Sequence, residues 1–186
     1  MRLTVLAISL TLLMSCNRAT DVGTPIDVKT AVDWTMTTAD GVPVTLSQAV
    51  SEQPVILLFW ATWCPYCKAL MPHLQSIRLE HGENVKVLAI HFRDDKGDPV
   101  AFIRDAGYDF TLLPNGEDVA RLYEVWGTPG VMIVDHDMKI RFNLITLPQR
   151  DPPGGGSRGS QAAYLAPYWA AEIRKTLGVV LGERSE

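Results

Sequence analysis

Two of the three cysteines in this chain, Cys64 and Cys67, lie three residues apart in the segment FWATWCPYCK. If Cys64 is the N-cap of a helix, Pro65 takes the first helical position, where its missing N–H costs nothing. The backbone amides of Tyr66 and Cys67 then point back at the Cys64 sulfur. Those amides and the positive end of the helix dipole favour thiolate over thiol, which lowers the pKa of such a cysteine. We therefore predict that Cys64 is the catalytic nucleophile.

Cys67 would lie one turn into the same helix, close enough to attack a mixed disulfide on Cys64 and release the substrate. The pair thus predicts thiol–disulfide exchange through a redox-active Cys64–Cys67 disulfide. Two other interpretations stay open at this point: a structural disulfide, or a metal site, since Cys-x-x-Cys is half of a zinc site.

The four histidines show no paired ligand spacing: His73, His81, His91 and His136. The chain has no cysteine besides this pair and Cys16. We therefore predict no metal site and no cofactor. Copper handling by the two thiols and a histidine remains the alternative function.

Hydrophobic patterning predicts an α/β layered domain around this pair. A hairpin is expected over 33–46, turning at Asp40-Gly41, followed by a short helical turn over 47–50. Strands are predicted over 54–61, 84–92, 130–135 and 139–145, with a short extended segment over 110–114. Helices are predicted over 65–81, 98–107 and 116–127, each followed or closed by a glycine. The tight turn before the last strand makes that strand antiparallel, so the sheet must be mixed.

Over about residues 30–145 this order resembles the TlpA/ResA-type thioredoxin-like proteins. The motifs that carry the resemblance are FWATWCPYCK, Pro72 in the following helix, GTPGVMIVD and the segment DGVPVTLSQAV. The resemblance implies a thioredoxin-like fold: a central mixed sheet flanked by helices, with an N-terminal β-hairpin and a helical insert. It also implies a cis bond between Thr128 and Pro129, packed against the cysteine pair.

The same resemblance implies how substrates are held and which partners act. The Thr128 backbone would pair with an extended substrate segment, and Trp63, Pro65 and Tyr66 would complete the substrate site. Trp60 is expected in the core or at its rim. The partners implied are protein thiols and disulfides and a membrane electron donor of the DsbD/CcdA type. The protein would be a reductant, as in cytochrome c maturation or envelope repair.

Two positions depart from the thioredoxin pattern. Leu58 stands where many thioredoxins have a buried acid, so any acid or base must come from elsewhere, with Glu124 or a water as candidates. The Pro-Tyr pair between the cysteines is the dipeptide common in glutaredoxins, which leaves the direction of electron flow open.

The N-terminus predicts an export signal. Residues 1–15 carry one charge, Arg2, and an apolar run that is too short to span a bilayer. The following Cys16 resembles the lipidated cysteine of bacterial lipoproteins, and 16–28 would be a polar tether. We therefore expect the protein in the bacterial cell envelope, lipid-anchored to the membrane on the periplasmic side. The net charge of -4 argues against nucleic acid as a partner.

The C-terminal part of the predicted domain 29–182 begins with a Pro/Gly-rich loop over 148–160. A helix is predicted over 166–178, with Pro167 at its first position and Trp169, Ile173 and Leu177 on one face. This helix is expected to close the fold.

Overall fold

The structure is a computed structural model that describes residues 29–152, 154 and 156–182. The predicted signal segment 1–15, Cys16 and the tether 16–28 lie outside the described residues. In the part that is described, no helix combines the length and the apolar character needed to cross a membrane.

A five-stranded mixed sheet forms the centre, in the order β5-β4-β3-β6-β7. The middle strand β3 (Val55–Trp60) runs parallel to β4 (Lys86–His91) and antiparallel to β6 (Gly130–Val134). β5 (Thr111–Leu113) extends the sheet parallel to β4, and β7 (Ile140–Asn143) extends it antiparallel to β6. This topology confirms the predicted mixed sheet, and the extended segment before residue 114 proves to be an edge strand.

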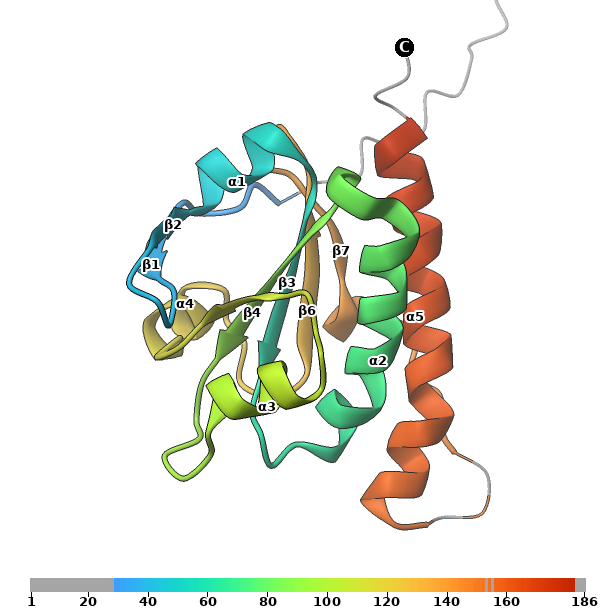
Figure 1. The fold of residues 1–186 in the computed structure, drawn as a ribbon. Helices are drawn as coiled ribbons and strands as arrows, with labels where there is room; N and C mark the ends of the chain where they lie inside the picture. Colours follow the sequence, from blue (N-terminus) through green and yellow to red (C-terminus); the bar gives the residue numbers. More distant parts are fainter. Residues whose placement is uncertain (1–28, 153, 155, 183–186) are drawn as a thin grey trace, which may run out of the picture.

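Helices and a small hairpin cover the two faces of the sheet (Figure 1). On one face α2 (Pro65–His81) and α5 (Arg158–Gly182) lie side by side, and α3 (Pro99–Asp105) packs on the same core. On the other face lie α1 (Leu46–Glu52), α4 (Glu117–Leu122) and the predicted hairpin, now β1 (Thr35–Thr37) and β2 (Pro43–Thr45). Short 3-10 turns, η1 (Gly82–Asn84) and η2 (Leu144–Thr146), follow α2 and β7.

Every residue of β3 is buried, as its continuous apolar sequence predicts. Successive side chains point to opposite faces, so Ile56, Leu58 and Trp60 face α2 and α5. Val55, Leu57 and Phe59 face the side of α1 and α4. Each such side chain contributes about 1.5–3 kcal/mol through burial. The strand therefore holds the cysteine segment that follows it rigidly in place.

The predicted C-terminal loop and helix boundaries are wrong. The helix begins at Arg158 rather than 166, so the loop ends earlier than predicted and Pro167 lies inside the helix. The physical reason is a buried stripe that starts further back: Ala162 and Ala166 continue the spacing of Ala170, Ile173 and Leu177. Burial of this stripe against α2 outweighs the cost of an internal proline.

The helix predicted over 116–127 is also too long, because α4 ends at Leu122. Glu124 has a φ of 56°, a left-handed conformation that cannot continue a helix. The chain instead turns there and leads toward Thr128. By contrast, α2 has the predicted limits, and Gly82 follows it with a φ of 53°.

Candidate active site

Cys64 occupies the N-cap of α2, directly after the segment that leaves the buried strand β3. Its Sγ accepts a hydrogen bond from the Cys67 backbone N–H at 3.1 Å. Pro65 is the first residue of the helix, and the Cys64 carbonyl accepts the first helical hydrogen bond, from Lys68 N–H, at 3.1 Å. This is the capping geometry that the sequence predicted, with sulfur in place of the usual oxygen.

The two thiols have opposite electrostatics. The Cys67 side chain, the Thr128 side chain and the backbone amides of Cys67 and Tyr66 all hydrogen-bond Cys64, the Cys67 side chain most strongly. Together these hydrogen bonds outweigh the opposing effect of burial and lower the pKa of Cys64 to about 6. Burial raises the pKa of Cys67 well above its usual value, and the neighbouring Cys64 raises it further. At neutral pH Cys64 is therefore the thiolate and Cys67 the proton-bearing partner. Both cysteines are free thiols and buried, Cys64 at 1% exposure.

The peptide bond between Thr128 and Pro129 is cis, as predicted. The Thr128 side chain hydrogen-bonds Cys64, and this contact helps to lower the pKa of that thiol. The segment that precedes β6 therefore lies next to the first residues of α2, although Thr128 and Cys64 are more than sixty residues apart in the sequence. This arrangement joins the reactive sulfur to a backbone segment at the end of a central strand.

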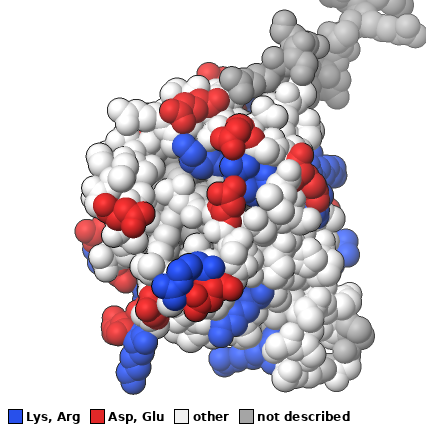
Figure 2. Space-filling view, in the orientation of Figure 1, with Lys and Arg blue, Asp and Glu red and all other residues white. Residues whose placement is uncertain are grey.

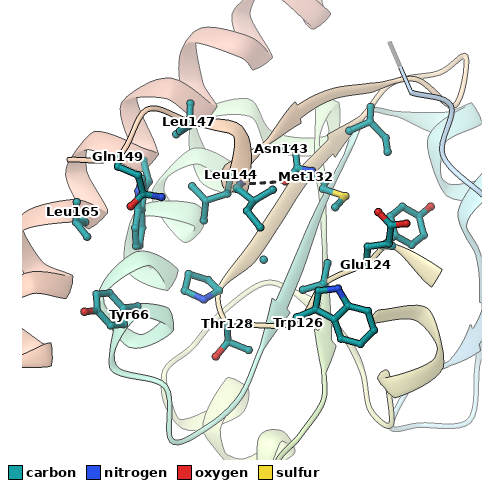
Figure 3. A pocket seen from close by; sticks show the side chains of 18 of the residues that line it. Tyr66, Glu124, Trp126, Thr128, Met132, Asn143, Leu144, Leu147, Gln149 and Leu165 are labelled. Atoms are coloured by element: carbon teal, nitrogen blue, oxygen red, sulfur yellow. Dashed lines mark hydrogen bonds between the residues drawn. The ribbon is translucent and has the colours of Figure 1, made fainter. Parts of the chain in front are cut away.

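A groove of about 640 Å³ opens beside this segment. Figure 3 shows Thr128 at the lower edge of the groove, with Tyr66 and Leu165 on one side and Trp126 and Glu124 on the other. The surface of the groove is part polar and part apolar, and two of its apolar side chains are strongly exposed: Trp126 at 67% and Ile145 at 75%. Its volume lies in the range of ordinary ligand sites, about 300–1,000 Å³.

Tyr66 connects the cysteine pair to the C-terminal helix. Its hydroxyl donates a hydrogen bond of 2.8 Å to Gln161 Oε1, and its ring lies 6.2 Å from that of Trp169. Gln161 in turn donates to the Gly156 carbonyl at 3.1 Å. The residue between the two cysteines is thus held by α5, a contact that the sequence analysis did not predict.

The remaining predicted site residues are placed differently. Trp63 is exposed at 56% and does not line the groove, while Pro65 is half-buried at the helix start. Trp60 is fully buried in the core, where it packs against His91 and Phe102 at ring distances of 5.2 Å. The two tryptophans therefore have separate environments, one inside and one at the surface.

The structure also shows the surroundings of Leu58 and Glu124, the two positions considered for an acid or base. Leu58 is fully buried, so no carboxyl stands at that position of the core. The Glu124 carboxylate lines the groove but is exposed and lies 3.8 Å from the Lys29 ammonium. The groups that chiefly shift the pKa values of the two cysteines do not include Glu124. The structure therefore gives Glu124 no link to proton transfer at Cys67.

Asp94 was missed by the sequence analysis. Its largely buried carboxylate accepts hydrogen bonds from the Thr62 N–H at 2.7 Å and from the Thr62 hydroxyl, two residues before Cys64. His91 lies 3.2 Å from it, and the Gly97 N–H donates to it at 2.9 Å. Burial raises the pKa of Asp94, but the hydrogen bonds from Thr62, His91 and Gly97 outweigh burial and lower it to about 2. In the sequence, only the acidic run after a buried strand could have hinted that Asp94 contacts the segment before Cys64.

Among residues 29–152, 154 and 156–182, no three His, Cys, Asp or Glu side chains are grouped so that they could hold a metal ion. His91, the histidine at the end of β4, is buried and directed at Asp94. Charged side chains of both signs are intermixed on the face shown in Figure 2.

Comparison with known proteins finds a family to which the chain is similar and a series of individual relatives. The AhpC/TSA family model matches residues 28–143. The chain is 28% identical over 92 residues to the thiol:disulfide interchange protein DsbE of Escherichia coli K12, covering 48% of each chain. It is 29% identical over 108 residues to the thioredoxin-like protein YneN of Bacillus subtilis, covering 56% of this chain and 63% of that protein.

Among solved structures, a secreted Mycobacterium tuberculosis disulfide oxidoreductase homologous to E. coli DsbE has a TM-score of 0.52 and 26% identity. The alignment covers 74% of this chain and 95% of that structure. The matches to the two curated relatives span about half and under two thirds of their lengths. Together these findings confirm the thioredoxin-like fold and are consistent with the TlpA/ResA resemblance.

Proposed function

The chain belongs to the AhpC/TSA family, and on its active-site geometry we propose that it is a thiol–disulfide oxidoreductase acting on protein disulfides through Cys64 and Cys67. The observation that carries the proposal is the opposite perturbation of the two thiols. A pKa of about 6 at the capping cysteine, beside a buried thiol of raised pKa, prepares one nucleophile and one resolving group.

The reaction starts with attack of the Cys64 thiolate on one sulfur of a substrate disulfide. The other substrate sulfur leaves as a thiolate, and a mixed disulfide with Cys64 remains. Cys67 then gives up its proton, which a released substrate thiolate takes up directly or through solvent, and attacks Cys64 Sγ. The Cys64–Cys67 bond forms and the second substrate sulfur leaves as a thiolate. The substrate disulfide gains two electrons from the protein, whose two thiols are oxidised to the Cys64–Cys67 disulfide.

The substrate would bind as an extended segment beside Thr128. Thr128 and Pro129 line the groove together with Tyr66, and Thr128 also reaches Cys64. Backbone groups at the end of a strand can pair with an added peptide strand. The exposed apolar side chains Trp126 and Ile145 favour a substrate segment with apolar residues around its cysteine.

Reduction of insulin disulfides by dithiothreitol tests the activity. The wild-type chain should accelerate it, and Cys64→Ser should abolish the acceleration. Lys68→Ala is a matched control, because Lys68 is an exposed residue on the same turn of α2. Equal rates for wild type and Cys64→Ser would refute the proposal, and stoichiometric copper binding by the reduced protein would then favour the metal-handling alternative.

We further propose that the protein works as a reductant with a reduction potential of roughly -250 to -200 mV, between those of thioredoxin and the glutaredoxins. Amide hydrogen bonds to the Cys64 thiolate stabilise the reduced form and raise the potential above that of thioredoxin. A rise of about 30 mV corresponds to about 1.4 kcal/mol, which one or two such bonds can supply. Equilibration with glutathione buffers measures the potential, and a value above about -150 mV would make the protein an oxidant instead.

Membrane tethering through Cys16, a periplasmic location and a membrane electron donor of the DsbD/CcdA type complete the proposal. Its support is the N-terminal sequence pattern, which ends in Leu-Met-Ser-Cys. Mass spectrometry of the mature protein tests it: an acylated N-terminal Cys16, lost in Cys16→Ala together with membrane association, is expected. Mature protein that still begins at Met1 would contradict it.

A further inference from the structure

Arg93 touches both segments that border the reactive sulfur. Its backbone carbonyl accepts a 3.0 Å hydrogen bond from the indole Nε1 of Trp63, the residue directly before Cys64. Its guanidinium donates a 2.6 Å hydrogen bond to the carbonyl of Trp126, two residues before Thr128. One residue therefore bridges the cysteine segment, through its backbone carbonyl, and the cis-proline segment, through its guanidinium.

The Arg93 backbone adopts a conformation that residues with a Cβ seldom take. Its φ is 57°, in the left-handed region, where a residue other than glycine carries a free-energy cost. A contact from α4 holds it there: the Arg93 N–H donates a 2.9 Å hydrogen bond to Glu117 Oε1. Strained residues of this kind persist only when the surrounding contacts hold them, and they cluster at functional sites.

Asp94, the residue after Arg93, also holds the cysteine segment. Asp94 binds both the backbone and the hydroxyl of Thr62, so residues 62 and 63 are each held by the segment that follows β4. Trp63 and Trp126 are among the most exposed large hydrophobic side chains, at 56% and 67%. Arg93 thus contacts the indole of Trp63 and the backbone of Trp126, two exposed tryptophans that precede Cys64 and Thr128 in the chain.

We propose that Arg93 is a positioning residue that fixes Trp63 relative to the Thr128–Pro129 segment, and that this arrangement selects protein disulfides over small disulfides. The proposal rests on the proposed function. A small disulfide needs only access to Cys64, whereas a folded or extended polypeptide must contact both bordering segments at once. Loss of the bridge should therefore slow the reaction with proteins and leave the reaction with small disulfides unchanged.

The test compares single-turnover rates of the reduced protein with insulin and with hydroxyethyl disulfide. Arg93→Gly removes the guanidinium and relieves the left-handed backbone, so it should fold. We expect its rate constant with insulin to fall by about tenfold, within the roughly 10²-fold that misplacement of a binding group can cost. The rate constant with hydroxyethyl disulfide should stay within about twofold of wild type. The midpoint of the pH profile of Cys64 alkylation should be the same as in wild type.

Two further variants make the result specific. Arg121→Ala removes another exposed arginine of the same region, one paired with Asp118, and should change neither rate. Arg93→Lys keeps the charge and a donor, and should recover part of the insulin rate. Equal losses with both disulfides, or no loss with insulin, would overturn the proposal. If wild type reduced neither disulfide, the proposed function itself would fail, which is a distinct outcome.

Discussion

The Tyr66 hydroxyl donates a 2.8 Å hydrogen bond to Gln161, a residue 95 positions later in the chain. Through this contact the first turns of α5 reach the dipeptide between the two cysteines. Residues 144–182 lie beyond the part that matches the family model, so one side of the groove is built by a region that the family match does not cover.

Tyr66→Phe should loosen the start of α5 without unfolding the protein. The substitution removes one hydrogen bond and keeps the ring beside Trp169, so a loss of about 0.5–1.5 kcal/mol in the free energy of unfolding is expected. Hydrogen exchange should become faster over residues 158–165, while exchange in β3 stays slow. Unchanged protection over 158–165 would show that the hydrogen bond does not hold the helix start.

Alkylation of Cys64 by iodoacetamide should follow its lowered pKa. The thiolate forms as the pH rises through about 6, so the rate should increase up to neutral pH and then level off. An unperturbed thiol, with a pKa of about 8.5, would still be gaining reactivity above pH 8. Peptide mapping assigns the label. Thr128→Val removes one hydrogen bond to the sulfur and should move the midpoint upward, and preferential labelling of Cys67 would reverse the assigned roles.

Cys67→Ser should trap a mixed disulfide between Cys64 and a protein substrate, because the neighbouring thiol that resolves it is removed. The adduct should be seen on a non-reducing gel and disappear with dithiothreitol. Cys64→Ser supplies the control, since the active-site thiol that it keeps, Cys67, is buried and has a raised pKa. Adducts that form equally well in Cys64→Ser would contradict the order of the two steps.

Leu177→Ala should weaken the packing of α5 on α2. Leu177 is fully buried in the cluster that includes Leu70 and Leu74, so a loss of about 2–5 kcal/mol is expected in chemical denaturation. Val179→Ala, two residues later, is the control. Val179 is 57% exposed, and a surface change of this kind should stay within about 0.5 kcal/mol. Similar losses in both variants would mean that the α5 packing is not what stabilises the fold.

The sequence by itself determined the local features around the cysteines. Cys64 at the helix cap, Pro65 at the first position and Gly82 at the end follow from interactions within a turn or two of the chain. Burial of β3 followed from its unbroken apolar run. The cis bond before Pro129 was predicted from the family resemblance, since local sequence gives no such preference.

The tertiary structure decided what depends on distant neighbours. The start of α5 is set by packing of Ala162 and Ala166 onto α2, a gain that residue propensities near Pro167 do not contain. Tyr66 meets Gln161 only because α2 and α5 pack side by side. Arg93 meets Trp63 and Trp126 only because the segments after β3 and β4 and before β6 lie at the same end of the sheet. Single hydrogen bonds of this kind are too weak to direct folding alone. They form where the packed core has already placed their partners, and no short stretch of sequence can report them.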